Sequence, residues 1–190
     1  TQTESRLGER VEVEHDADGV ARRVMVRSAL VGAVETVGAP TGFTVLGQQV
    51  VVNTLAVHGP VTQFGGGYTG IGSVRAGEAV EVHGFIVRTG KGFSVQATRV
   101  EKLPALPAFL KVTGLASGVG PAEFRLGSLV VGTATAALLP EGAVLTDGQV
   151  VSVLAAAGTL QASPAAPPRL RSAQVRIHSV GVVGTEISAS

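Results

Sequence analysis

Four histidines are the side chains of this sequence best suited to bind a metal ion or to transfer protons near neutral pH. They lie far apart and form no His-x-His or His-x-x-x-His pair; they are His15, His58, His83 and His178. The sequence also contains no cysteine. We therefore expect neither a metal site nor a bound cofactor. His83 follows Glu81 on the same face of an expected strand, where the two could hold a cation, but we favour a solvated polar edge.

Nucleophilic catalysis would need a serine or threonine presented beside a base. The sequence has no Gly-x-Ser-x-Gly motif, which would place a serine at a sharp strand-to-helix turn. Glu12 and Glu14 form a carboxylate pair that could act in general acid–base chemistry. They alternate with valines, however, so they are expected on the exposed face of a strand. These patterns predict that the chain is not an enzyme.

Glycines are concentrated between residues 65 and 72, a spacing that invites comparison with phosphate-binding loops. No Lys-Ser or Lys-Thr pair follows them and no helix is expected after them, so a flexible surface loop is the favoured interpretation. Phe64 and Tyr68 flank these glycines. Because aromatic side chains are enriched where proteins bind partners, we predict that Phe64 and Tyr68 form a partner-contact site.

The composition favours a folded chain of short strands. Of the 190 residues, 45% are hydrophobic and 15% are charged, which suffices for one large or two small cores. Valine-rich runs punctuated by 26 glycines are typical of strands and tight turns. A net charge of +1 and an aromatic content of 4% disfavour nucleic-acid binding. No apolar run approaches the roughly 20 residues that a membrane-spanning helix needs.

One pattern recurs three times: a glycine, two alternating valines, a turn, and then a small residue followed three positions later by valine. The copies begin at Gly8, Gly77 and Gly148. Their first parts contain Val11 and Val13, Val80 and Val82, and Val151 and Val153, and their second parts contain Ala21 and Val24, Ala97 and Val100, and Ser172 and Val175. The period-2 alternation predicts that each copy is a pair of strands.

The other half of the repeating unit occurs twice in full, from Gly32 onward and from Gly114 onward, and a third start is expected at residues 180–183. Each whole unit then has about five strands, which cannot bury both faces as a flat sheet. The sequence therefore predicts an all-β protein of tandem, small, five-stranded, OB-like antiparallel barrels. Phe43 and Phe124 are the expected large core residues, one in each barrel.

The order of these motifs resembles a bacterial family known as domain of unknown function 5666. The resemblance is carried by Phe43-Thr44-Val45-x-Gly47, by Ala76-Gly77-Glu78-Ala79-Val80-Glu81-Val82-His83-Gly84 and by Ala97-Thr98-Arg99-Val100-Glu101, and residues 30–102 match best. It implies tandem β-barrel modules of exported or lipid-anchored bacterial proteins, and it implies no catalytic residue. Residues 109–179 depart from the pattern, because Ala155 replaces Gly84 and a proline-rich loop replaces the hairpin around Gly90.

These motifs divide the chain into four parts. Residues 1–28 are the trailing half of a repeat, 29–103 a first full barrel, 104–179 a second barrel, and 180–190 the leading strand of a further repeat. Residues 103–107, which include two prolines, are the expected linker. An alternative frame begins the modules at Gly8, Gly77 and Gly148. Within residues 134–145, an alanine- and leucine-rich stretch could form a short helix.

The sequence favours a structural function outside the cytoplasm. Thr1 in place of methionine is expected of a processed or excised product, and together with the resemblance it predicts a periplasmic, cell-surface or secreted bacterial protein. An incomplete first repeat would leave the strand that contains Val11 and Val13 without a neighbour. Strand addition between subunits would fill that edge and link copies head to tail.

We therefore expect a protein that assembles with itself, or with another envelope protein, into a fibre or envelope layer. Three alternatives stay open. Trimming of the chain would explain the incomplete repeats. The chain could be a monomeric binding module for an oligosaccharide, another polysaccharide or single-stranded nucleic acid. It could also be an enzyme of an uncharacterised kind.

Overall fold

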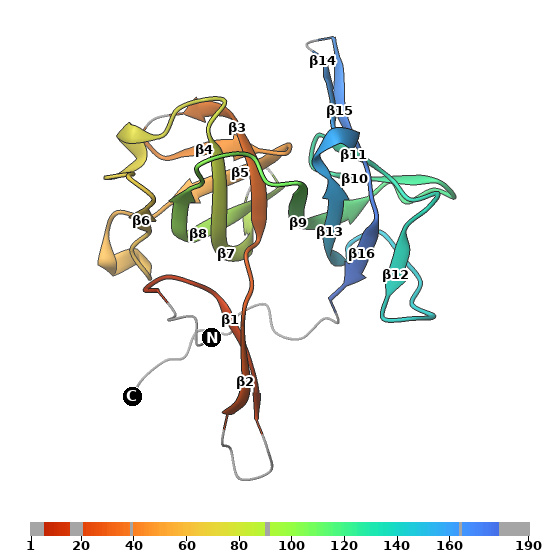
Figure 1. The fold of residues 1–190 in the computed structure, drawn as a ribbon, viewed down its shortest axis with the longest axis horizontal. Coiled ribbons are helices and arrows are strands. Elements are labelled where there is room, and N and C mark those ends of the chain that lie inside the picture. Colours follow the sequence, from red (N-terminus) through yellow and green to blue (C-terminus); the bar gives the residue numbers. More distant parts are fainter. Residues whose placement is uncertain (1–5, 16–20, 39, 90–91, 164, 179–190) are drawn as a thin grey trace.

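The computed structural model describes residues 6–15, 21–38, 40–89, 92–163 and 165–178. Strands dominate these residues, which confirms an all-β fold (Figure 1). The strands are β1 (Val11–His15), β2 (Ala21–Val26), β3 (Leu30–Gly38), β4 (Gly42–Val45), β5 (Gln48–Val52), β6 (Gln63–Gly65), β7 (Ala79–Thr89), β8 (Gly92–Lys102), β9 (Phe109–Ser117), β10 (Glu123–Leu126), β11 (Leu129–Gly132), β12 (Ala137–Leu139), β13 (Val150–Ala156), β14 (Gln161–Ser163), β15 (Ala166–Arg171) and β16 (Gln174–Ile177). Three short 3-10 helices are η1 (Ala56–His58), η2 (Ile71–Ser73) and η3 (Ala157–Thr159).

Five strands close into a barrel, which we call the first barrel. β3 pairs with β4, β4 with β5, β5 with β8, β8 with β7, and β7 with β3 again. All of these pairs are antiparallel except β5 with β8, which is parallel. Closure gives each of the five strands a neighbour on both sides, so the ring itself has no free edge.

The hairpin between β4 and β5 shows how local sequence builds this barrel. Val45 lies opposite Gln48, and the two residues between them, Leu46 and Gly47, have φ values of 48° and 72°. Two positive φ angles are typical of the tight hairpin turns that match the twist of the strands. Leucine rarely adopts this conformation, but Leu46 is 1% exposed, so the buried side chain offsets the strain.

The predicted core aromatics are confirmed. Phe43 is 0% exposed and lies opposite Val50, and Phe124 is 1% exposed and lies opposite Val131. Both rings belong to a core made mostly of valine and leucine, in which they are the largest fully buried side chains.

The strands after the first barrel form a second group, β9–β16. β9 pairs with β10 and β13, β10 with β11, β11 with β15 in parallel, and β13 with β16. Only Ser172 and Ala173 separate β15 from β16. The N–H of Ser172 donates to the carbonyl of Gly132 at 3.0 Å, and that of Ala173 to the carbonyl of Leu154 at 2.9 Å. The β15–β16 segment therefore passes from β11 to β13.

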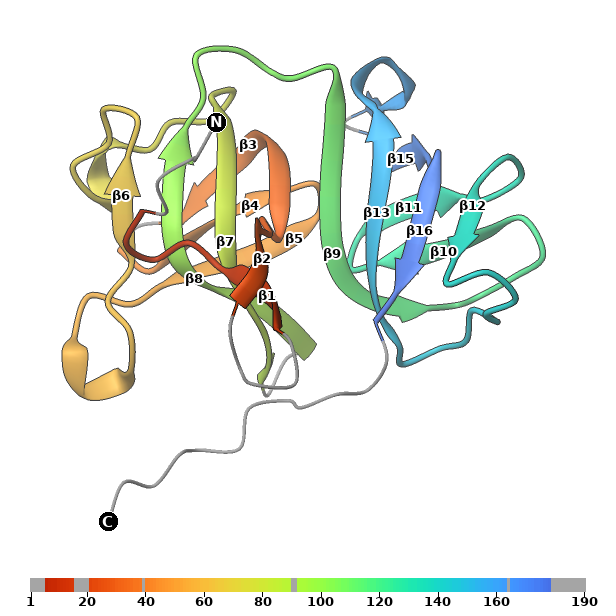
Figure 2. The same ribbon diagram turned by 60° about the horizontal axis from the view of Figure 1, so that its bottom comes forward.

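The two groups of strands share one sheet (Figure 2). β3 pairs with β9, with Leu30 opposite Val112 and Val31 opposite Lys111, so β8, β7, β3, β9, β13 and β16 form one antiparallel series. A buried polar contact reinforces this junction, because Nε2 of Gln48 donates to the carbonyl of Leu126 at 2.6 Å.

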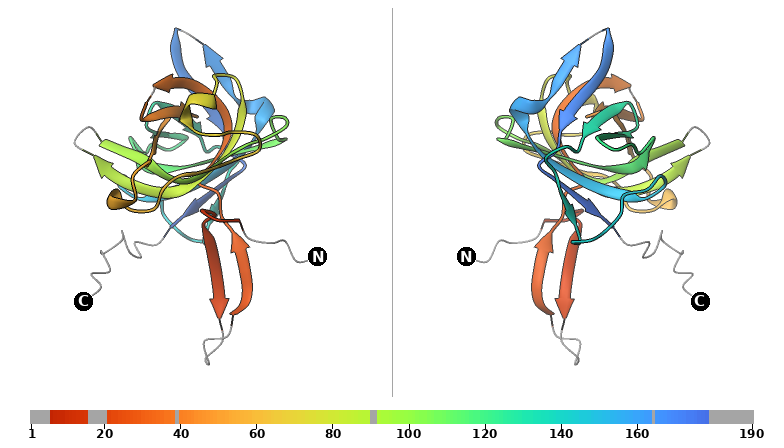
Figure 3. Two further views of the ribbon diagram at one scale, coloured as in Figure 1. Left: turned by 90° about the vertical axis from the view of Figure 1, so that its left-hand side faces the viewer. Right: turned by 90° about the vertical axis from the view of Figure 1, so that its right-hand side faces the viewer.

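The β1–β2 hairpin stands apart from that sheet. It projects away from the body of the molecule (Figures 1 and 3). β1 and β2 make a two-stranded sheet of their own, and among the described residues neither strand pairs with a third. The expected leading strand at residues 180–183 lies outside the described residues.

Two further expectations concern the connecting segments. Residues 103–107 form the expected strand-free connection, here between β8 and β9. The short helix considered within residues 134–145 is wrong, because this stretch contains β12, which pairs in parallel with β16 instead. Within the part of the chain that the structure describes, no helix is long and apolar enough to cross a membrane.

Candidate functional site

The predicted contact residues Phe64 and Tyr68 lie against the first barrel. Phe64 is on β6, opposite Val100 of β8, and packs partly buried against the core. Tyr68 is 6% exposed, and its hydroxyl donates to Oε2 of Glu78 at 2.7 Å. The glycine-rich segment is thus packed on β8, where a Cβ atom on Gly66 would lie 2.1 Å from the carbonyl oxygen of Lys102. A partner-binding role for these two aromatic residues stays a prediction.

Glu78 connects this segment to β8 through a charged cluster. Lys102 hydrogen-bonds to Oε1 of Glu78, and its ammonium lies 5.7 Å from the centre of the Tyr68 ring. The Lys102 hydrogen bond, followed by that of Tyr68, lowers the pKa of Glu78 to about 2. Burial, followed by the bond to Glu78, raises the pKa of the Tyr68 hydroxyl. Tyr68, Glu78 and Lys102 all interact within the cluster, so the cluster holds the glycine-rich loop against the first barrel.

Val11 and Val13 lie on β1, opposite Val26 and Val24 of β2. Their side chains fall outside what the structure describes, but the backbone pairing places both on the hairpin that has no third strand. The structure therefore separates the four predicted contact residues into two places, because Phe64 and Tyr68 belong to the barrel. Among the described contacts, none joins Phe64 or Tyr68 to Val11 or Val13.

Residues 6–10, just before β1, cross the outer face of β7 and β8. The guanidinium of Arg6 pairs with Glu101, the carbonyl of Leu7 accepts from Arg99 at 3.0 Å, and that of Gly8 accepts from the Thr98 hydroxyl at 2.6 Å. The guanidinium of Arg10 lies 5.5 Å from the centre of the Phe85 ring. These contacts anchor the base of the projecting hairpin to the first barrel.

His83 lies beneath this segment and is 2% exposed. The N–H of Arg10 donates to Nδ1 of His83 at 3.3 Å, and Nε2 lies 3.6 Å from Oε1 of Glu81. Burial lowers the pKa of His83, and the charge of Glu81 opposes that shift. The prediction of a solvated polar edge is wrong for His83, because residues 6–10 cover it. Among the described residues, no group of three or more His, Cys, Asp or Glu side chains could hold a metal ion.

Ser152 and His178 form a contact in the second group of strands. The sequence did not reveal this contact. The hydroxyl of Ser152 on β13 lies 2.7 Å from Nε2 of His178 and 2.7 Å from the hydroxyl of Thr113 on β9. An imidazole beside a serine hydroxyl is the arrangement from which nucleophilic catalysis starts. Here the hydroxyl is also engaged by Thr113, which is 5% exposed. The contact therefore links β9, β13 and the residue that follows β16.

Lys111 lies on β9, two residues before Thr113. Its pKa is lowered, first by burial and then by the positive charge of Arg27. Arg10 and Arg176 act in the same direction, and Glu81 opposes them. Three arginines therefore lie near enough to Lys111 to disfavour its charged form, and Glu81 partly offsets them.

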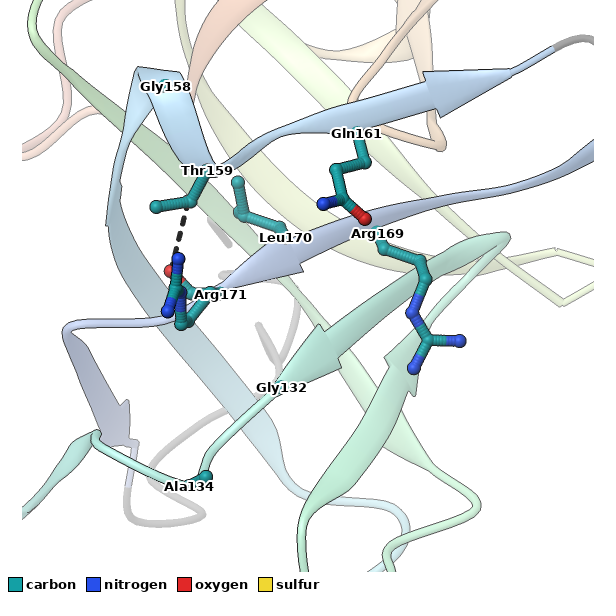
Figure 4. Close-up of a pocket in the computed structure, with 8 residues that line it drawn as sticks. All are labelled: Gly132, Ala134, Gly158, Thr159, Gln161, Arg169, Leu170 and Arg171. Atoms are coloured by element: carbon teal, nitrogen blue, oxygen red, sulfur yellow. Dashed lines mark hydrogen bonds between the residues drawn. The ribbon is translucent and has the colours of Figure 1, made fainter.

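A shallow pocket of about 400 Å³ opens beside β11 and β15 (Figure 4). Arg169, Arg171 and Gln161 line it with polar side chains, together with the small residues Gly132 and Ala134. The hydroxyl of Thr159 donates to the carbonyl of Arg171 at 3.1 Å. Two guanidinium groups and an amide at an open pocket could hydrogen-bond to hydroxyl or anionic groups of a ligand. Arg169 already forms an ion pair with Glu123.

The sequence offers no local signal for the contact between Ser152 and Thr113. The pairing of Ser152 with Thr113 could have been found only from the register of β9 and β13, because the two residues are distant in the chain. No family model, curated protein or solved structure matches the chain. The resemblance to domain of unknown function 5666 therefore stays a prediction.

Proposed function

We propose that this chain is a non-catalytic, extracytoplasmic structural and interaction protein of tandem OB-like modules, which joins to other copies of itself by strand addition at β1–β2. One observation carries the proposal: among the described residues, neither β1 nor β2 pairs with a third strand. An unpaired strand edge presents a row of N–H and C=O groups that a strand of another molecule can bind. The extracytoplasmic part rests on the resemblance to exported bacterial proteins.

The order of the strands supports the OB-like part of this proposal. Around the first barrel the order is β3, β4, β5, β8, β7, which is the first, second, third, fifth and fourth strand along the chain. OB-folds are five-stranded Greek-key barrels. The second group follows the same order if β15 and β16 are taken as one strand interrupted at Ser172 and Ala173.

Residue pairs support the tandem part. Val82 lies opposite Val100 in the first barrel, and Val153 lies opposite Val175 in the second group. These are the residues that the repeat aligns with each other. A shared register at aligned valines is expected if both groups of strands are copies of one module.

Sedimentation velocity over a series of concentrations tests the self-association. The full chain should sediment faster as its concentration rises, and a variant that lacks residues 1–27 should not. Val57→Lys is the control and should sediment as the full chain does, because Val57 is 85% exposed on η1 and does not belong to the hairpin. A single monomeric species of the full chain at the highest concentration would contradict the proposal.

The pocket beside β15 favours a second candidate, a monomeric module that binds an oligosaccharide or single-stranded nucleic acid. Its two arginines and Gln161 supply hydrogen-bond donors to sugar hydroxyls or phosphates. Titration with neutral and acidic oligosaccharides, followed by NMR, should shift the signals of Arg169 and Arg171 if this function is correct. An unchanged spectrum at millimolar ligand would exclude the oligosaccharide form of this function.

A further inference from the structure

Residues 6–9 repeat a turn found in both groups of strands. The matching turns are residues 75–78 and 146–149. In each turn the third residue is glycine with a positive φ, 86° at Gly8, 84° at Gly77 and 87° at Gly148. In each, the N–H of the first residue donates to the side chain of the fourth: Arg6 to Glu9 at 2.8 Å, Arg75 to Glu78 at 3.0 Å, and Thr146 to Gln149 at 2.8 Å.

The strands that follow these turns also match. Val13 lies opposite Val24, as Val82 lies opposite Val100 and Val153 opposite Val175. The next pairs are Glu14 with Arg23 and His83 with Arg99, and the register then shifts by one residue in both hairpins. A bulge bends its strand and increases the local twist, so a bulge at the same place indicates that the two hairpins bend in the same way.

A third match closes the base of each hairpin. The N–H of Arg27 donates to the carbonyl of Arg10 at 2.7 Å, that of Leu103 to Ala79 at 2.8 Å, and that of His178 to Val150 at 2.9 Å. The turn, the register, the bulge and the closing bond therefore agree between residues 6–27 and the last two strands of the first barrel.

We infer that β1–β2 is the closing hairpin of a third barrel, and that its binding partner is the leading part of a module of this class, equivalent to β3–β6. This inference goes beyond the proposed self-association, in which one edge of β1–β2 binds a strand of another copy. A single extra strand would satisfy one edge of the hairpin. The leading part of a module would satisfy both and would enclose a core.

The existing barrels show which atoms such a partner would bind. In the first barrel the N–H of Gly77 donates to the carbonyl of Val34 at 2.8 Å, and the N–H of Val34 donates to the carbonyl of Glu78 at 2.9 Å. Ala116 makes the same two bonds, each of 2.8 Å, with Gly148 and Gln149. Among the described residues, the N–H of Gly8 and the carbonyl of Glu9 have no such main-chain partner. They are the expected docking atoms.

The register of the partner follows from the same comparison. Leu30 lies opposite Val82 and Gly32 opposite Val80, so the incoming strand should place an apolar residue opposite Val13 and a glycine opposite Val11. On the other edge, Phe64 lies opposite Val100 in parallel, and Leu138 lies opposite Val175 in the same way. A second, parallel strand should therefore place an apolar residue opposite Val24.

A folded second copy does not present such a partner, because its β3–β6 strands are already paired within its own first barrel. Delivering them would require that barrel to open, as in domain swapping. The partner is therefore the leading part of a module that has no closing hairpin of its own.

Hydrogen exchange on a fusion protein tests this inference. A copy of residues 29–76 is placed ahead of residue 1 of the full chain, and exchange of the Gly8 amide is compared with that in the chain alone. We expect exchange to slow by about a hundredfold or more, because an amide in a closed barrel exchanges only when the barrel opens. The matched control carries Gly32→Pro and Phe43→Asp in the added copy only, and should give no slowing.

Disulfide trapping tests the register independently, since the chain has no cysteine of its own. Val13→Cys should form a disulfide with Leu30→Cys in the added copy under oxidised glutathione, because directly opposite residues lie within the span of a disulfide. Val13→Cys with Val31→Cys, one residue out of register, should form far less. If the amino-terminal fusion does not fold, the same copy is attached after residue 190 through a flexible linker.

Equal Gly8 exchange in the test and control fusions, or equal trapping of both cysteine pairs, would overturn the inference. Failure of the proposed function gives a different result. If the chain alone stays monomeric while the fusion protects Gly8, self-association is wrong and the inference stands. If the chain associates while no fusion protects Gly8, the inference is wrong and the proposed function stands.

Discussion

The main-chain N–H of Arg10 donates to Nδ1 of the buried His83 at 3.3 Å, so an unprotonated imidazole nitrogen fixes the base of the β1–β2 hairpin to the first barrel. Only a nitrogen without a proton can accept this bond. The position of the hairpin is therefore linked to the protonation of one side chain.

This link predicts a loss of stability in mild acid. Burial lowers the pKa of His83 below its unfolded value of about 6.5, so the unfolded chain binds the proton more readily than the folded one. The contribution of His83 is fully present above pH 6.5 or so and is lost progressively as the pH falls toward the lower folded pKa. Urea unfolding at pH 7 and pH 5 measures it. His83→Asn, which keeps an acceptor but does not titrate, should show a smaller difference between the two pH values, and an equal difference would contradict the assignment.

Glu78 predicts a second acid transition at lower pH. Its hydrogen bonds to Lys102 and Tyr68 lower its pKa to about 2, so its contribution to stability is present above the unfolded pKa of about 4.5 and is lost as the pH falls toward 2. Glu78→Gln should remove this component of the acid unfolding curve. Glu35→Gln is the control, because Glu35 is an exposed residue elsewhere on the first barrel. Identical acid midpoints for Glu78→Gln and the unaltered chain would disprove the prediction.

The two buried phenylalanines should have equivalent energetic roles. Phe43→Ala and Phe124→Ala should each lower the free energy of unfolding by about 3–5 kcal/mol, because each leaves a cavity in a closely packed core. Phe109→Ala, at a side chain that is 53% exposed, should cost much less. Denaturant unfolding followed by circular dichroism compares the three. A loss at Phe124 no larger than at Phe109 would argue against a core in the second group.

Gly84 marks a close approach of β7 and β8. A Cβ atom there would lie 2.2 Å from the carbonyl oxygen of Gln96, so Gly84→Ala must displace the backbone of β8. We expect a loss of about 1–3 kcal/mol, the usual cost of overpacking. Gly72→Ala is the control, since a Cβ atom there would meet nothing within 4 Å. Thermal unfolding of both variants gives the comparison, and an equal effect would show that steric contact at Gly84 is unimportant.

The strands and core residues could be predicted because their signals are local. Valines that alternate with polar residues indicate strands, and glycines between valine-rich runs indicate turns. The burial of His83 could not be predicted, because it depends on residues 6–10 crossing a strand far along the chain. Tyr68 was expected on a surface loop for the same reason, since its partners Glu78 and Lys102 come together only when the barrel closes. The Ser152–His178 contact likewise required the order of the strands.

Hydrogen exchange of the unaltered chain at low and high concentration shows whether copies associate through the β1–β2 hairpin, because it locates the amides that become protected. We expect amides of β1 and β2 to exchange more slowly at high concentration, in step with faster sedimentation, while amides near the exposed Val57 do not change. Association without any slowing in β1 and β2 would contradict this expectation, as would unchanged exchange and sedimentation over the whole concentration range.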